Sequence, residues 1–186
     1  MSGTTIPITS DAAASRIAPG LVLKCAMGLA ALLAFALLPL DRAVVGAFAG
    51  AVLLLLAAID VEHRIIPNRI VVPATAVVLV AQLALFPSQA LEWVLAALAC
   101  ALALLIPNLF GRSLMGMGDV KLGLLIGASL GWSAIVALLV GFLLTFPVAL
   151  VLLVRSGLAA RKATMPFGPF LALGALLVLL VPHIAG

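Results

Sequence analysis

Two aspartates in an otherwise apolar chain are the first candidates for chemistry. Asp60 ends the run GAFAGAVLLLLAAID, and Asp119 stands after a glycine in MGMGDVKLG, directly before another apolar run. An ionisable side chain next to hydrocarbon is costly and usually has a partner or a function. A purely structural role is open for each, because Asp119 suits the start of a helix and Asp60 could pair with Arg64 one turn later. The unusual sequence around both acids favours chemistry.

A pair of carboxylates in a sheltered site has a specific use. Two such groups do not both ionise readily at close range, so one keeps its proton while the other loses it. The ionised group can activate water as a general base, and the protonated group can hydrogen-bond the scissile carbonyl and later protonate the leaving amine. This is aspartic-protease chemistry, which needs no metal and no cofactor. Gly116 and Gly118 fit it, because glycine lets backbone approach a substrate and adopt a positive φ before a helix begins.

Other chemistries find less support in the sequence. The P-loop spacing GxxxxGK[ST] is absent, and Asp119 inside such a loop would repel a phosphate. No GxSxG element occurs, and no serine or cysteine nucleophile has a suitable histidine base. Cys25 and Cys100 lie in separate apolar runs without a CxxC or His/Cys cluster, which favours buried thiols over a disulfide or a metal site.

The composition places these residues in a membrane protein. Of the 186 residues, 66% are apolar and 9% charged, and the mean hydropathy is +1.42. Soluble chains are nearer half apolar and a quarter charged. The apolar runs are continuous, unlike the alternating strands of a β-barrel. At about 20 residues per span, the length allows six or seven spans. We therefore expect an all-α, polytopic membrane helix bundle.

Seven apolar runs define the predicted spans. Residues 1–19 are small, polar and interrupted by proline, which predicts a flexible cytoplasmic tail before a membrane-embedded domain at 20–186. The first run also resembles a signal-peptide core, but its length and the lack of a clear cleavage site favour a transmembrane helix. The fifth run is short and, if helical, should lie behind other helices. The spans are roughly 21–40, 43–60, 70–86, 91–107, 120–131, 133–154 and 168–185.

The basic residues orient these spans. With the N-terminus inside, alternating spans put nine of the ten lysines and arginines at one face and only Arg42 at the other. This asymmetry indicates that the basic face is cytoplasmic, and it explains the net charge of +4 without a nucleic-acid partner. Asp60 and Asp119 then both lie at cytoplasmic ends of spans. The residues on the basic face are Arg16, Lys24, Arg64, Arg69, Arg112, Lys121, Arg155, Arg161 and Lys162.

Three ordered motifs surround the two aspartates. Asp60 begins DVEHRIIPNRIVVP, which contains the IPN segment Ile66-Pro67-Asn68. GMGDVKLG supplies a GxGDxK element through Gly116, Gly118, Asp119 and Lys121. MPFGPFLALG follows near the last span. Together these motifs, over roughly residues 50–175, resemble those of the type IV prepilin peptidases, membrane-embedded aspartic proteases of the GxGD type.

This resemblance implies an activity and roles for residues. Family members cleave the basic leader peptides of prepilins and pseudopilins after a glycine at the cytoplasmic face, and the substrate's apolar segment stays in the bilayer. Asp60 and Asp119 would be the catalytic pair, in a six-helix peptidase core preceded by one N-terminal helix. The protein is expected in the cytoplasmic (inner) membrane. The residues expected to shape the site or bind substrate are Gly116, Gly118, Lys121, Pro67, Asn68, Pro166, Phe167, Gly168 and Pro169.

The chain departs from the longer bacterial members of this family. Those carry a cytoplasmic insertion with paired CxxC motifs, associated with bound zinc and with N-methylation of the new N-terminus. This chain has two cysteines and no such insertion. It resembles the short, peptidase-only form found with Flp/Tad-type pili and in some archaeal relatives, for which a separate enzyme would methylate the product.

Two other functions stay open at this point. Asp60, Asp119 and Lys121 could form the ion pathway of a small proton-coupled transporter, although transport relays usually lie near the bilayer midplane. The chain could also be a non-enzymatic subunit of a pilus or secretion machine, with the acids in structural contacts. The sequence leaves open whether the two acids meet.

Overall fold

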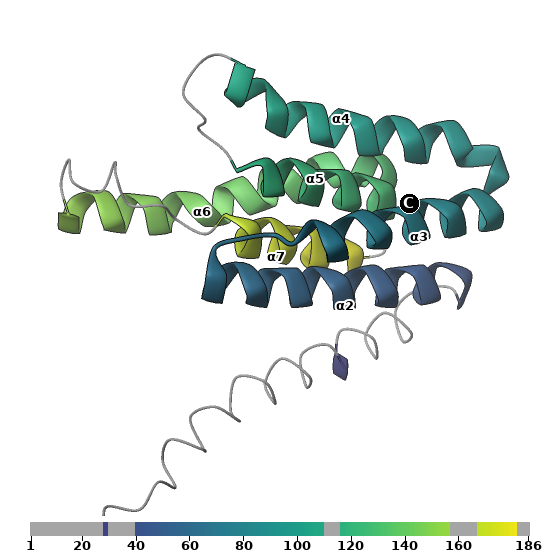
Figure 1. Cartoon of the computed structure of the whole chain (residues 1–186), viewed down its shortest axis with the longest axis horizontal. Coiled ribbons are helices and arrows are strands. Elements are labelled where there is room, and N and C mark those ends of the chain that lie inside the picture. The colour runs from purple at the N-terminus through teal and green to yellow at the C-terminus, as the bar shows by residue number, and fades with distance from the viewer. Residues whose placement is uncertain (1–27, 30–39, 110–115, 157–166, 182–186) are drawn as a thin grey trace, which may run out of the picture.

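The described part of the chain is helical, as the sequence predicts. The computed structural model describes residues 28–29, 40–109, 116–156 and 167–181, and these ranges contain no strand (Figure 1). The helices are α2 Leu40–His63, α3 Asn68–Leu85, α4 Ala90–Leu109, α5 Met117–Leu130, α6 Ala134–Ser156 and α7 Gly168–Leu179, with short 3₁₀ helices η1 Pro87–Gln89 and η2 Gly131–Ser133.

Six of the seven predicted spans correspond one to one with these six α-helices. The uncertain boundary between the fifth and sixth spans lies at η2, where Gly131 ends α5 with a φ of 57°, a conformation that residues with a Cβ rarely adopt. Apart from Gly28 and Leu29, the predicted tail and first span lie outside the described residues, so a seventh span stays a prediction.

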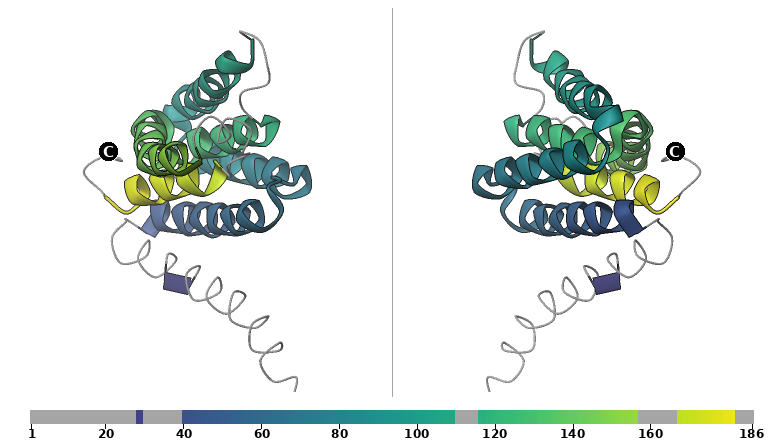
Figure 2. Two further views of the ribbon diagram at one scale, coloured as in Figure 1. Left: turned by 90° about the vertical axis from the view of Figure 1, so that its left-hand side faces the viewer. Right: turned by 90° about the vertical axis from the view of Figure 1, so that its right-hand side faces the viewer.

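Successive helices run in alternating directions, so their ends gather at two opposite ends of the bundle (Figure 1). One end collects the last turn of α2 and the first turns of α3, α5 and α7. The other end collects the start of α2, the α3–α4 connection and the α5–α6 connection. Seen along the bundle in Figure 2, α5 lies between α3 and α4, and α7 lies between α2 and α6.

Most of the length of helix α5 is enclosed by other helices. Eight of the nine positions from Leu122 to Leu130 are buried, and the ninth, Leu124, is partly exposed. This confirms the expectation that the short fifth span lies behind other helices.

Glycines let neighbouring helices approach to backbone contact. A Cβ on Gly127 of α5 would lie 2.5 Å from the carbonyl oxygen of Ala96 in α4, and a Cβ on Gly174 of α7 would collide with that of Ala137 in α6. Close packing through small residues is characteristic of helices in membranes, where lipid provides no hydrophobic drive for association. These contacts fix α5 on α4 and α7 on α6.

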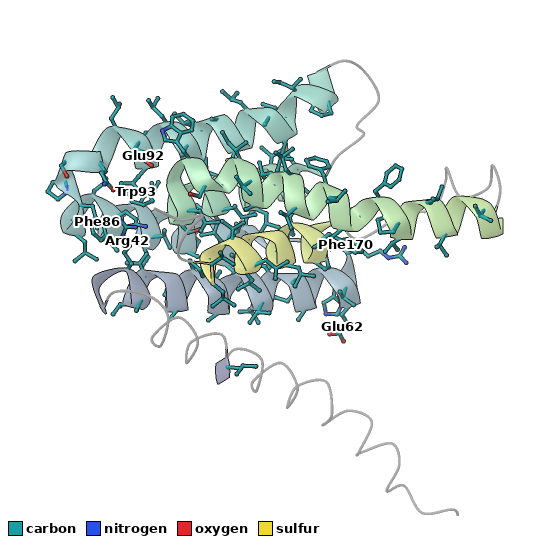
Figure 3. The ribbon with its side chains drawn as sticks, turned by 180° about the vertical axis from the view of Figure 1, so that it is seen from behind. Arg42, Glu62, Phe86, Glu92, Trp93 and Phe170 are labelled. Atoms are coloured by element: carbon teal, nitrogen blue, oxygen red, sulfur yellow. The ribbon has the colours of Figure 1, made fainter. Side chains whose placement is uncertain are left out.

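The outer surface of the bundle suits lipid. Four described segments are long and apolar enough to span a bilayer: Arg42–His63, Asn68–Leu85, Pro87–Pro107 and Met117–Val148, the last of which includes α5, η2 and part of α6. Side chains project outward from the ribbon on all sides of the bundle (Figure 3). The large apolar residues that are exposed include Val80, Leu98 and Leu143. Such a surface is compatible with hydrocarbon and not with water. The described helices therefore form a multi-pass membrane bundle.

The glycine contacts lead to a stability prediction. We expect Gly127→Ala and Gly174→Ala each to lower the free energy of unfolding by about 1–3 kcal/mol, because each Cβ must push backbone apart. Thermal unfolding of the purified protein in detergent measures this. Gly50→Ala is the matched control, because its Cβ would meet only the flexible ends of Leu176 and Leu179. Unchanged unfolding temperatures for both test variants would contradict the packing argument.

Candidate active site

Asp60 is a buried acid held by the start of another helix. It lies in the last turn of α2 and is 6% exposed. Its Oδ2 accepts a hydrogen bond of 3.0 Å from the backbone N–H of Gly168, the first residue of α7. A carboxylate near the C-terminus of its own helix is disfavoured by that helix dipole, and the N-terminus of α7 offsets this. Asp60 forms no ion pair with Arg64, although the spacing of four residues in the sequence made this pairing possible.

The chain turns sharply after Asp60. Arg64 adopts a φ of 54°, and its N–H donates to the carbonyl oxygen of Asp60 over 2.8 Å. A left-handed residue that closes the last turn in this way is a common helix ending, although glycine usually takes the position. The turn directs Ile65 and Ile66 back across the end of the bundle towards α3. From the sequence, Arg64 was expected only as a possible ion-pair partner of Asp60 and as a basic residue, and Ile66 only as part of the IPN segment. Ile65 carried no signal beyond its place between Asp60 and Pro67.

The PFGPF element builds the partner of Asp60. Phe167 precedes α7 and packs against Phe142 of α6, with ring centroids 5.1 Å apart. Gly168 follows, and Pro169 occupies the first turn, where a missing N–H costs nothing. A Cβ on Gly168 would lie 2.7 Å from Asp60 Oδ2, so only glycine permits this contact. Pro166 lies outside the described residues.

Asp119 lies in the first turn of α5, and its backbone N–H donates to the Gly116 carbonyl oxygen over 3.0 Å. Gly116 is the N-cap with a φ of −65°, and Gly118 is helical, so the expectation of a positive φ at these glycines is wrong. Gly118 has a packing reason instead: its Cβ would lie 2.9 Å from the Cβ of Ile66. The absence of that Cβ lets the α2–α3 turn lie directly against the start of α5.

Asp60 and Asp119 line one pocket at this end of the bundle. The pocket has a volume of about 250 Å³, and both aspartates lie in its wall. It is large enough for several water molecules or part of a peptide chain. Among the described residues, no group of three His, Cys, Asp or Glu side chains could hold a metal ion. The residues that line the pocket are Asp60, Arg64, Ile65, Ile66, Gly116, Gly118 and Asp119.

A side-chain hydrogen bond joins helices α3 and α5 beside this pocket. Lys121 Nζ, one turn into α5, donates to Asn68 Oδ1 at the start of α3 over 2.6 Å. Pro67 precedes Asn68 as the N-cap of α3, in an extended conformation that ends the turn after α2. The bond therefore links the IPN segment to the GxGDxK segment across 53 residues.

A second, mainly apolar groove begins at Lys121. It has a volume of about 220 Å³ and runs between α3 and α5. The groove is lined by Val71, Val72, Thr75, Ala76, Leu79, Lys121 and Leu124.

The amino-acid sequence is similar to a known protein family. The family model described as the type IV leader peptidase family matches residues 47–181, which include both aspartates, the Asn68–Lys121 pair and the PFGPF element. No curated protein and no solved structure matches the chain significantly. The match covers most of the chain, and its description agrees with the resemblance of the three motifs. The chain belongs to the type IV leader peptidase family, and it is a multi-pass membrane peptidase of the kind that acts on prepilin-type substrates.

Proposed function

We propose that this protein is an aspartic endopeptidase that removes the leader peptide of prepilins or prepilin-like proteins, with Asp60 and Asp119 as the acid/base pair and water as nucleophile. The observation that carries the proposal is the convergence of the two acids, from helices far apart in the chain, on one pocket. Two carboxylates that share a site can divide the roles of base and acid between them.

The chemistry follows from that division of roles. The ionised carboxylate takes a proton from a water molecule in the pocket as the water attacks the scissile carbonyl carbon. The protonated carboxylic acid donates to the carbonyl oxygen, where negative charge develops. Collapse of the tetrahedral intermediate breaks the C–N bond, and the protonated carboxylic acid gives its proton to the leaving amine nitrogen, while the other carboxyl group keeps the proton taken from water. The Gly168 N–H occupies Oδ2 of Asp60, which leaves the other oxygen of that carboxyl group for this work.

The distribution of charge supports a cytoplasmic position for the pocket. Arg64, Arg69 and Lys121 lie at the pocket end of the bundle, and Arg42 lies at the opposite end. Figure 3 shows Arg42 at the end of the bundle opposite Glu62, which lies in the last turn of α2. Basic residues at membrane ends are retained in the cytoplasm. We therefore place the pocket at the cytoplasmic face of the inner membrane.

The groove between α3 and α5 supports a substrate with an apolar segment. It begins beside the pocket at Lys121 and continues along the bundle among aliphatic side chains. We propose that the segment of the substrate that follows the cleavage site lies in this groove while the leader reaches the pocket. The position of both acids at one end of the bundle also argues against a transport relay, which would need ionisable groups deeper in the membrane.

The acid pair is tested by isosteric substitution. We expect Asp60→Asn and Asp119→Asn each to lower the rate of prepilin cleavage by about 10²–10⁴-fold, the usual contribution of a general acid or base. Cleavage of a co-expressed prepilin, followed by its change in mobility, measures this. Glu62→Gln is the matched control, because this exposed acid lies two residues from Asp60. Near-normal cleavage by either aspartate variant, or loss of wild-type activity in EDTA, would refute the proposal.

The Gly168 contact is tested at the same site. We expect Gly168→Ala to reduce kcat strongly with little change in KM, because the added Cβ would displace the Asp60 carboxylate without touching the apolar groove. As a control, we expect the Gly50→Ala variant to cleave prepilin at the wild-type rate. A Gly168→Ala protein that accumulates in the membrane and cleaves normally would show that this hydrogen bond is dispensable.

The proposed role of the groove between α3 and α5 is tested by a larger side chain in its wall. We expect Ala76→Phe to raise KM for a full-length prepilin severalfold, and to leave cleavage of a short leader peptide without the apolar segment unchanged. Val77→Phe is the control, because Val77 is also exposed on α3 but does not line the groove. Equal effects of the two variants, or an equal effect on both substrates, would contradict the assignment of the groove.

A further inference from the structure

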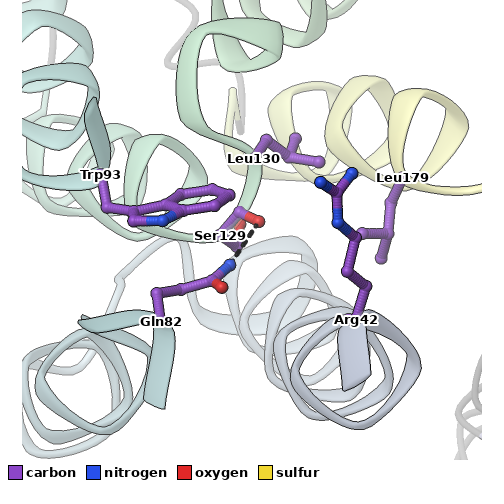
Figure 4. Close-up of a pocket in the computed structure, with 7 residues that line it drawn as sticks. Arg42, Gln82, Trp93, Ser129, Leu130 and Leu179 are labelled. Atoms are coloured by element: carbon purple, nitrogen blue, oxygen red, sulfur yellow. Dashed lines mark hydrogen bonds between the residues drawn. The ribbon is translucent and has the colours of Figure 1, made fainter. Parts of the chain in front are cut away.

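A small cavity lies at the end of the bundle opposite the aspartates. Its volume is about 30 Å³, which is room for one or two water molecules. Five helices meet at it (Figure 4), and they contribute Arg42 and Gly46 from α2, Gln82 from α3, Trp93 from α4, Ser129 and Leu130 from α5, and Leu179 from α7. None of these residues belongs to the pocket that holds Asp60 and Asp119.

Two polar atoms in the wall of this cavity have no hydrogen-bond partner among the described residues. They are Oε1 of Gln82 and Nε1 of Trp93. Their side chains are 5% and 8% exposed, respectively. Leaving such a group buried and unpaired costs about 1–3 kcal/mol, and buried polar groups in native proteins are almost always paired with protein or with ordered water.

The orientation of the Gln82 amide is fixed. Its Nε2 donates to the carbonyl oxygen of Ser129 over 3.3 Å, which leaves Oε1 as a free acceptor. The indole Nε1–H of Trp93 can only donate. One side chain therefore offers a donor and the other an acceptor at the same cavity (Figure 4).

We propose that this cavity holds a buried water molecule, which accepts a hydrogen bond from Trp93 Nε1–H and donates one to Gln82 Oε1. Water is the ligand that suits both atoms, because it donates and accepts at once. A phosphate group is too large for a cavity of about 30 Å³. The Arg42 guanidinium in the same wall disfavours a cation.

The water would connect helices that have few other polar links. It joins α3 to α4, and the Gln82–Ser129 bond continues the connection to α5. Around it, Trp93 packs on Phe86 with ring centroids 6.3 Å apart, and the Arg42 guanidinium lies 5.6 Å from the centre of the Phe86 ring. A cation over an aromatic face is stabilised there. The contact with Phe86 therefore stabilises the charged side chain of Arg42 within the protein at this end of the bundle.

Solution NMR of the full chain in nanodiscs tests the water directly. The chain has two tryptophans, so ¹⁵N-indole labelling gives two N–H signals, which Trp132→Phe assigns. We expect the Trp93 indole proton to show a cross-peak to a long-lived water, and Gln82→Met to abolish it while the protein stays folded. No such cross-peak in the wild-type protein would overturn the proposal. A cross-peak that persists unchanged in Gln82→Met would overturn the bridging role of Gln82.

A thermal-stability cycle tests the same water by a different measurement. We expect Gln82→Met and Trp93→Phe each to lower the unfolding temperature, and the double variant to lose less than the sum, because each single change leaves the other polar atom unpaired. Trp132→Phe is the control for loss of an indole at an exposed position. Additive losses would show that the two side chains share no partner. Neither measurement depends on peptidase activity.

Discussion

The hydrogen bond from the Gly168 N–H to the Asp60 carboxylate is the interaction on which the candidate site depends. It joins residues 108 positions apart and brings the N-terminus of α7 to the C-terminus of α2. A buried carboxylate in a membrane protein is costly unless it is paired or hydrogen-bonded. The bond therefore constrains three things together: the packing of α7 on α2, the position of Asp60 near the end of the bundle, and the absence of a side chain at residue 168.

The second acid is positioned by packing and not by a bond of its own to a distant partner. Gly127 lets α5 lie against the backbone of α4, and Gly118 lets the turn after α2 lie against the first turn of α5. The Lys121–Asn68 hydrogen bond then links α5 to the start of α3. Asp119 faces the same pocket as Asp60 because these contacts fix both the axial position and the rotation of α5.

The polar side chains at the two ends of the bundle line spaces of very different size. At one end, two carboxyl groups line an open pocket of about 250 Å³. At the other end, Gln82 and Trp93 close around a cavity of about 30 Å³. Between them the helices pack through glycine and aliphatic side chains, as the lack of solvent in the bilayer requires.

The sequence by itself determined the class of fold, six of the helices and the presence of Asp60 and Asp119 at the same end of the bundle. Hydropathy and the distribution of charge are local properties, and a membrane translates them directly into spans and orientation. The motifs also identified the family. Tertiary structure alone decided that Asp60 bonds to Gly168 and not to Arg64, and that Gly118 serves packing and not a positive φ. It also decided that Gln82 and Trp93 share a cavity. These outcomes depend on which helices are neighbours and how each is rotated, and no spacing within one helix encodes that.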